Sequence, residues 1–367
     1  MNIGRRDFLR SSAAVSALAV LPARLRAAPA INAFAPTPGA WRSFEVTTRI
    51  EIPRAAGPAR AWVPLPSLAT TDWIRPEGDD WTSNGSASVQ RSGRARMVAV
   101  EWADASSGAA IEVRSRIATR DRAIDFTRTV TSAPLTTAER ARYTAGTTLV
   151  PIDGIVGDTA QAITAGATSD VAKVHRIYEW IVANTFRDPN ARGCGTGDIA
   201  AMLRSGRLGG KCADLNALFV GLARASGVPA RELYGIRVAP SRFGYKSLGA
   251  NGPDITKAQH CRAEVYLANV GWVPVDPADV RKVMLEESPG NLPLDEARVD
   301  AARHTLFGAW ETNWIAYNDS RDITLPGSGG PPIGFLMYPQ AETAAGRLDC
   351  LSPDSFKYSI ATKEIAI

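Results

Sequence analysis

The sequence contains few of the residues that bind metals or form disulfides: three histidines and four cysteines among 367 residues. No two cysteines stand close enough to form a Cys-x-x-Cys pair. A zinc site or a thioredoxin-like redox motif therefore has no support, and we expect neither a metal nor a cofactor. The even number of cysteines permits disulfides, for example between Cys194 and Cys350, without establishing any.

The chain also has almost no net charge outside residues 1–30. Residues 1–30 hold five of the 42 basic residues and one of the 37 acidic residues, which leaves 37 basic and 36 acidic residues in the body. A nearly neutral body gives no electrostatic reason to expect nucleic acid or an anionic membrane as a partner. The composition, 45% hydrophobic and 22% charged, excludes disordered, collagen-like and coiled-coil chains.

No apolar run reaches the roughly 18 residues that a membrane-spanning helix needs. The apolar run at residues 11–23 has 13 residues, follows the adjacent arginines Arg5 and Arg6, and precedes the small-x-small site at residues 28–30. This pattern is typical of a cleavable export signal of the twin-arginine type. We therefore expect residues 1–30 to be removed and the mature protein to be periplasmic, with no membrane span.

Residues 31–150 predict an antiparallel β region. Phe44, Val46, Ile50 and Ile52 fall on one parity with polar residues between them, as in a half-buried strand. Further extended segments are expected at residues 61–65, 97–102 and 111–117. Four tryptophans, at positions 62, 73, 81 and 102, would suit either a sugar-binding surface or interior packing, of which packing is the commoner.

In residues 151–300 the spacing of the apolar residues changes to that of a helix. This segment therefore predicts a core of helices followed by antiparallel strands. Helices are expected at residues 170–184, with Asp170 as N-cap, at 198–205, and after Gly209-Gly210, where leucines and a phenylalanine form a buried stripe at positions 215, 218, 219 and 222. Strands are expected at residues 232–238, 261–267 and 272–276. This order predicts an α+β fold, with residues 301–367 as a C-terminal extension that packs on the core.

Cys212 lies at the first turn of the helix that follows the two glycines. The N-terminal end of a helix favours negative charge and offers unpaired N–H groups, which stabilise a thiolate and an oxyanion on an attacked carbonyl group. A lone cysteine is more often a small buried residue. The stripe of leucines defines a buried face without Cys212, which favours the nucleophile.

His260 and Asp276 belong to two successive predicted strands. By strand parity the side chain of His260 shares a face with Arg262, and Cys261 points away from the group that His260 addresses. A tight turn centred on Ala268 would place His260 opposite Asp276, whereas a turn centred on residues 269–270 would need a bulge. An imidazole between a thiol and a carboxylate can deprotonate the nucleophile and later protonate the leaving group.

Three ordered motifs carry a resemblance to a known family. Gly-x-Cys-x-Asp at residues 210–214, His-x-x-x-Glu-Val-Tyr at 260–266 and Gly-Trp-Val-Pro-Val-Asp-Pro at 271–277 resemble the core of the transglutaminase-like superfamily. The resemblance covers residues 170–277 and implies a papain-like α+β fold. It also implies that Cys212 is the nucleophile, His260 the general base and acid, and Asp276 the group that orients the imidazole.

The resemblance is incomplete in three respects. Arg262 stands where many members have an aromatic residue, and the acidic calcium loops of the animal cross-linking enzymes have no counterpart. An oxyanion donor from a side chain is not identified by a motif; Gln259 and Asn184 are the candidates. The glycine-rich loop at residues 193–198 lacks the lysine and hydroxyl of a phosphate-binding loop, so we expect it to shape a cleft near Cys212.

These observations predict an exported cysteine enzyme that takes an acyl group from a peptide or amide of the cell envelope through a thioester. Water is the favoured acceptor, as in a peptidase or amidase, because the resemblance is to bacterial members and the calcium loops are missing. The alternatives are an amine-accepting transglutaminase and a catalytically silent binding module of the envelope. A thiol redox protein would need a second cysteine at short spacing.

Overall fold

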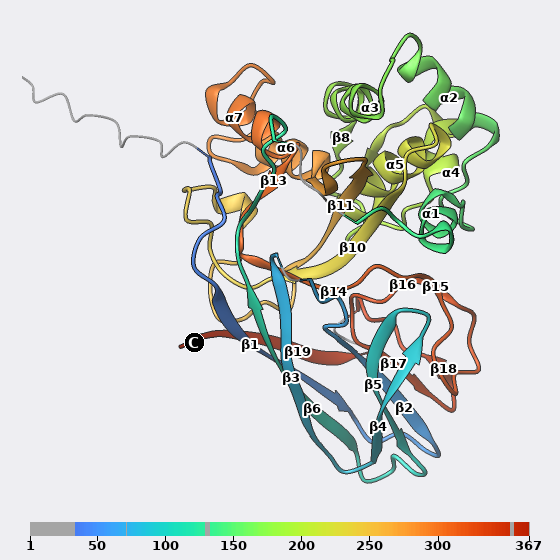
Figure 1. The fold of residues 1–367 in the computed structure, drawn as a ribbon. Helices are drawn as coiled ribbons and strands as arrows, with labels where there is room; N and C mark the ends of the chain where they lie inside the picture. The colour runs from blue at the N-terminus through green and yellow to red at the C-terminus, as the bar shows by residue number, and fades with distance from the viewer. Residues whose placement is uncertain (1–33, 71, 129–132, 353–355, 367) are drawn as a thin grey trace, which may run out of the picture. The chain divides into compact units, whose positions relative to one another are not determined.

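The structure is a computed structural model that describes residues 34–366 except residue 71, residues 129–132 and residues 353–355 (Figure 1). These residues fall within a single compact unit. The expected signal peptide, and with it the expected export route, lies outside the described residues. No helix of the described part of the chain has the length and the apolar composition that would carry it through a bilayer.

Two antiparallel sheets form the β region that the sequence predicts. One sheet has the order β19-β1-β6-β3 and the other the order β18-β17-β2-β5-β4. Alternating apolar residues of both sheets, among them Ile50, Val63, Val98 and Ile111, pack into one hydrophobic core. The strands of the N-terminal region are β1 (Arg42–Ile52), β2 (Ala59–Leu65), β3 (Ile74–Ser83), β4 (Ser86–Ser92), β5 (Ala95–Trp102), β6 (Ala109–Thr119) and β7 (Arg122–Ala123).

The tryptophans of this region pack in the interior. Trp62, Trp73 and Trp102 are buried and Trp81 is half-buried. The commoner role for these residues, packing, is therefore confirmed over an exposed sugar-binding surface.

The C-terminal segment completes sheets that begin far earlier in the chain. Strand β19 (Lys357–Ile365), red in Figure 1, pairs along the whole of β1 from Ser43 to Glu51. Strand β17 (Gln340–Thr343) pairs with β2, and β14 (Trp314–Asn318) pairs with β10. The other strands of this segment are β13 (Ala309–Trp310), β15 (Arg321–Ile323), β16 (Ile333–Phe335) and β18 (Gly346–Arg347).

The middle of the chain forms helices packed on a second antiparallel sheet of order β12-β11-β10-β14. Helix α5 (Cys212–Ala225) packs on β10 (Ala230–Arg237) and β11 (Gln259–Leu267), and α2 (Gly154–Thr164) and α3 (Asp170–Asn184) cover α5. The remaining elements are α1 (Thr137–Thr144), β8 (Phe186–Arg187), α4 (Ile199–Ser205), β9 (Gly209–Gly210), η1 (Lys246–Leu248), β12 (Gly271–Val275), α6 (Pro277–Glu286) and α7 (Ala297–Thr305).

The predicted helices and strands of the core are confirmed with two corrections. The N-cap of α3 is Ser169, whose hydroxyl accepts a hydrogen bond from the Ala172 amide, so Asp170 is the first helical residue. Helix α5 is buried on all sides from Cys212 to Arg224. The leucine stripe therefore does not separate Cys212 from the buried residues, because two helices and a sheet surround α5.

Candidate active site

Cys212 is the first residue of α5, at the point where a short strand turns into the helix. Gly209 and Gly210 form β9, which pairs in parallel with β8. A Cβ atom on Gly210 would lie 2.4 Å from the Cβ of Asp214, so only glycine lets the chain enter the helix this way. Within the described residues the Cys212 amide has no hydrogen-bond partner, as expected for the first N–H of a helix.

Asp214 ties the glycine-rich loop to the start of α5. One carboxylate oxygen accepts hydrogen bonds from the amides of Thr196 (3.0 Å) and Gly197 (2.9 Å), and the other accepts one from Lys211 (2.9 Å). Gly195 has a φ of +93° and leaves space that a side chain would take from this carboxylate. The Gly-x-Cys-x-Asp motif thus builds the support of the thiol, and the loop shapes the site as the sequence predicts.

The turn between β11 and β12 differs from both predicted arrangements. The two strands pair as Leu267 with Gly271 and Ala263 with Val275, which centres the turn on Asn269 and requires no bulge. Asn269 has a φ of +65°, which Asn tolerates better than most residues. Asp276 consequently lies beyond the end of β12 and reaches His260 diagonally instead of from the opposite position.

His260 and Asp276 are in direct contact in the interior. The Nε2 atom of the imidazole lies 2.7 Å from Oδ2 of Asp276, and both side chains are almost completely buried. The other carboxylate oxygen, Oδ1, accepts hydrogen bonds from the Asp279 amide (3.1 Å) and from Nδ2 of Asn216 (3.2 Å). Asp276 is therefore the N-cap of α6 as well as the partner of the imidazole, which fixes its orientation.

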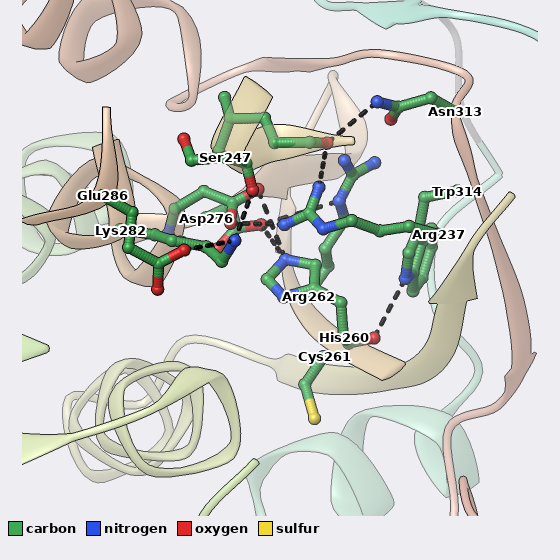
Figure 2. A network of polar contacts seen from close by, with 12 residues as sticks. Arg237, Ser247, His260, Cys261, Arg262, Asp276, Lys282, Glu286, Asn313 and Trp314 are labelled. Carbon is green, nitrogen blue, oxygen red and sulfur yellow. Dashed lines mark hydrogen bonds and ion pairs between the residues drawn. The ribbon is translucent and has the colours of Figure 1, made fainter. Parts of the chain in front are cut away.

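Two arginines and a second carboxylate surround this pair (Figure 2). Asp279 approaches Nε2 of His260 at 3.4 Å and forms a 2.6 Å ion pair with Arg237. Arg262 lies 3.5 Å from Asp276 and stacks against Trp310 and Trp314. The arginine that stands in the place of the family's aromatic residue thus packs against aromatic rings supplied by other elements.

The charges around His260 keep it protonated. Burial and the nearby Arg237 disfavour the imidazolium, but the carboxylates of Asp279 and Asp276 outweigh them and raise the pKa of His260 to about 9. For Asp279, Arg237 and the imidazole overcome the effect of burial and hold its pKa well below the usual range. At neutral pH the buried cluster therefore contains an imidazolium between two carboxylates.

The thiol of Cys212 is placed to ionise. Hydrogen bonds from the thiols of Cys194 and Cys261, followed by the imidazole of His260, hold the pKa of Cys212 well below its usual range against the effect of burial. Because Nε2 of His260 is engaged by carboxylates, Nδ1 is the ring nitrogen available to the sulfur. A thiolate beside an imidazolium is the form that a sulfur nucleophile requires.

The expectation that Cys261 points away from the group addressed by His260 is wrong. Figure 2 shows the Cys261 thiol directed away from the polar network around the imidazole, and its hydrogen bond goes to Sδ of Met337 (3.9 Å). Helix α5 packs over β11, and both Cys261 and His260 lie near enough to Cys212 to lower the pKa of its thiol. All four cysteines are free thiols, so Cys194 and Cys350 do not form a disulfide.

The thiol and the imidazole open onto one cavity of about 1080 Å³. Cys194, Gln259 and Tyr338 line it together with Cys212 and His260. Cys212 is only 4% exposed and lies in the wall of this space. The cavity is large enough to hold several residues of a peptide.

The two candidates for an oxyanion donor lie in different places. Gln259 lines the cavity, and its buried Nε2 atom has no hydrogen-bond partner among the described residues. Asn184 is exposed at the end of α3 and donates to the Trp180 carbonyl group. His175 and His304 are exposed on α3 and α7, away from the cavity lining.

Sequence reasoning missed three residues of the site: Asn216, Arg237 and Asp279. Asn216 stands four residues after Cys212 in α5 and therefore on the same helical face, a spacing that would have indicated it. Asp279 follows Asp276 by three residues in the first turn of α6. Arg237 has no local signal, because its partner Asp279 lies 42 residues away.

Among the residues that the structure describes, the donor atoms of His260, Asp276 and Asp279 lie within 4.8 Å of one another, close enough to hold a metal ion. The guanidinium groups of Arg237 and Arg262 approach the same two carboxylates. Positive charge from the chain itself therefore already occupies the position that a cation would take.

Comparisons with known proteins identify the class of this fold. Residues 157–277 match the family model described as "Transglutaminase-like superfamily". An uncharacterised protein of Haemophilus influenzae is 40% identical over 232 residues, which are 61% of this chain and 62% of that protein. The chain thus matches less than two thirds of that relative.

Two solved structures are also similar. A proposed cysteine protease from Cytophaga hutchinsonii has a TM-score of 0.50 and 15% identity, covering 89% of this chain and 99% of that one. The periplasmic domain of TgpA from Pseudomonas aeruginosa has a TM-score of 0.32 and 17% identity, covering 66% and 88%. The fold is transglutaminase-like, and the match to the superfamily model extends over residues 157–277.

Proposed function

We propose that this chain is a cysteine enzyme that transfers an acyl group from an amide, with Cys212 as nucleophile, His260 as general acid and base, and Asp276 as the group that orients the imidazole. One observation carries the proposal. Cys212, whose thiol has a lowered pKa, and His260, whose imidazole is fixed by a buried carboxylate, line the same cavity. A binding module would not need these three residues together.

The reaction has two steps. The thiolate sulfur forms a bond to the carbonyl carbon, His260 gives its proton to the amide nitrogen, and the carbon–nitrogen bond breaks to leave a thioester and a free amine. A water molecule then gives a proton to His260 and attacks the thioester, which releases a carboxylic acid and restores the thiolate. Asp276 keeps the ring in place through both steps by its 2.7 Å contact with Nε2.

The oxyanion of each step needs hydrogen-bond donors. The unpaired amide of Cys212 is one, and the partnerless Nε2 of Gln259 is the other that we propose. We expect Gln259→Ala to lower kcat by about 10²–10³-fold and Asn184→Ala, the matched control, to leave it unchanged. Peptide turnover by both variants, with thermal unfolding as a check on folding, tests this assignment.

The nucleophile is tested by alkylation and by turnover. We expect iodoacetamide to modify Cys212 before Cys350, which lines the same cavity but whose pKa is raised by burial. Peptide mapping by mass spectrometry identifies the modified site. We expect Cys212→Ala to abolish formation of the acyl-enzyme and Cys350→Ala to preserve it. Preferential alkylation of Cys350 would contradict the proposal.

The acceptor is tested with envelope peptides in ¹⁸O-labelled water that also contains a labelled primary amine. We expect ¹⁸O in the new carboxyl group of the product. Incorporation of the amine instead would identify a transamidating enzyme with the same nucleophile. Binding of a peptide without turnover, unchanged in Cys212→Ala, would identify a binding module.

A further inference from the structure

The walls of the cavity carry far more positive than negative charge. Its lining includes seven lysine and arginine residues but only two acidic residues, Asp254 and Glu286. The body of the chain has 37 basic and 36 acidic residues, so this imbalance is local. Cationic side chains are gathered at the one cavity that contains the thiol.

Part of this positive charge is already neutralised. Glu286 pairs with Arg187 and Lys282, Arg192 pairs with Asp349, and the buried Arg237 pairs with Asp279.

Three lysines remain: Lys211, Lys257 and Lys357, which form no ion pair within 4.0 Å with any described residue, although Lys257 lies near enough to Asp254 to stabilise its carboxylate. Lys211 immediately precedes the nucleophile.

Lys257 and Lys357 come from two segments that are joined by hydrogen bonds. The amide of Ile255 donates to the carbonyl group of Ile360 in β19 (2.8 Å), and the amide of Thr362 donates to that of Pro253 (2.9 Å). Both lysines are exposed, and they belong to one wall of the cavity. A hollow with a surplus of one charge concentrates ligands of the opposite charge, because its low-dielectric walls focus the field.

We propose that this cavity selects acyl donors that carry a carboxylate close to the amide bond, so that acidic peptides are its substrate class. The inference rests on the proposed function, since it assigns a substrate class to the same thiol. Lys257 and Lys357 are the specificity-determining residues, and the unpaired Lys211 adds to the attraction at the sulfur.

The effect of the positive charge in the cavity is measured by the rates at which two reagents alkylate Cys212. The two reagents differ in one group. Iodoacetate carries a carboxylate next to the carbon that the sulfur attacks, and iodoacetamide carries a neutral amide there; in both cases the carbon–sulfur bond forms as iodide leaves. We expect the ratio of the iodoacetate rate to the iodoacetamide rate at Cys212 to exceed the same ratio for N-acetylcysteine. We also expect it to fall as salt is added, because salt screens exposed charges.

The variants assign this effect to the lysines. In water, one unit charge at roughly 10 Å from another changes a rate about twofold, so we expect Lys257→Gln with Lys357→Gln to lower the ratio by up to about fourfold. Lys363→Gln is the matched control. Lys363 and Lys357 are both exposed on β19, and each lies opposite a glutamate of β1. Lys363, however, does not line the cavity. This control should leave the ratio unchanged.

The same variants are then tested on pairs of peptides that differ only by glutamate or glutamine beside the amide. We expect the glutamate peptide to be consumed several times faster by the wild-type protein, and the preference to shrink in the double variant. Faster consumption of the glutamine peptide, or a ratio of alkylation rates that the double variant does not lower, overturns the inference. If iodoacetamide does not modify Cys212 ahead of Cys350, the proposed function itself fails.

Discussion

At the scale of single residues, the site is a set of buried charges that depend on one another. Arg237, Arg262 and the imidazolium of His260 carry three positive charges against the carboxylates of Asp276 and Asp279. An ionised Cys212 supplies a third negative charge and brings this group to neutrality. The surrounding groups therefore favour the thiolate here, against the effect of burial, which favours the thiol.

This balance predicts an unusual titration of His260. We expect its imidazole to stay protonated at pH 7–8 and to lose its proton at about pH 9, because Asp279 and Asp276 stabilise the charged ring. Since the pKa in the folded protein lies above the ordinary histidine pKa of 6.5, this group stabilises the fold fully below pH 6.5. That contribution is lost as the pH rises through about 9.

Nitrogen-15 NMR of histidine-labelled protein measures the titration, and His260→Asn assigns the signal. Asp279→Asn should lower the pKa of His260, whereas Asp300→Asn, whose side chain lies beside the exposed His304, should not. Denaturant unfolding at pH 6.5 and pH 9 measures the loss of stability. Deprotonation of His260 near pH 6.5 in the wild-type protein would contradict this account.

At the scale of elements, the thiol depends on how α5 is joined to the glycine-rich loop. The carboxylate of Asp214 holds two loop amides and one amide at the start of α5, all within 3.0 Å. These are hydrogen bonds to an ionisable group in a largely buried position. Losing them would leave backbone donors without partners and release the loop that lines the cavity.

We expect Asp214→Ala to lower the free energy of unfolding by about 2–4 kcal/mol and to slow acylation of Cys212. Asp198→Ala is the matched control, because Asp198 caps the neighbouring helix α4 through one hydrogen bond, to the Ala201 amide. Its cost should be about 1 kcal/mol, with no change in the rate at Cys212. Chemical denaturation and iodoacetamide kinetics measure both effects; equal behaviour of the two variants would contradict the role given to Asp214.

The sequence predicts the elements with strong periodicity and misses those without it. Helices α3 and α5 and strands β1 and β11 follow from regular spacing of apolar residues. Strand β19 does not, because only Ile360 among its residues is buried and its partner β1 lies some 300 residues earlier. The register between His260 and Asp276 depends on the left-handed conformation of Asn269, which spacing alone does not determine.

For the site, the sequence motifs identify the three residues that match the family pattern. They do not identify the residues that surround these three. Asp279 in α6 and Arg237 in β10 form an ion pair, and no local sequence pattern predicts a pair between two separate elements. Gln259 emerges as the better oxyanion candidate only because its Nε2 is buried without a partner beside the cavity. Such facts depend on tertiary packing.

At the scale of the whole molecule, the last part of the chain adds strands to the three largest sheets of the described residues. Strand β14 forms an edge of the core sheet, β17 joins the sheet of β2, and β19 covers β1. The same segment supplies Tyr338 and Lys357 to the cavity. The residues after 300 are therefore structural partners of both the β region and the core.

A chain that ends at Leu351 tests this dependence. We expect it to lose the nine residue pairs between β1 and β19, to unfold at a lower temperature and to aggregate through the exposed edge of β1. A chain that ends at Ile365 keeps every pair and is the control. Circular dichroism and size-exclusion chromatography compare the two; equal melting temperatures would contradict the role of β19.

The position of β19 also governs when the protein can act. Ribosomes make the chain from its N-terminus, so Cys212 and His260 emerge well before the segment that closes one side of their cavity. A nascent or prematurely stopped polypeptide would hold the reactive thiol without the wall that carries Lys357. Under the proposed function, selectivity would thus be acquired only once the last strand of the chain has been made and paired with β1.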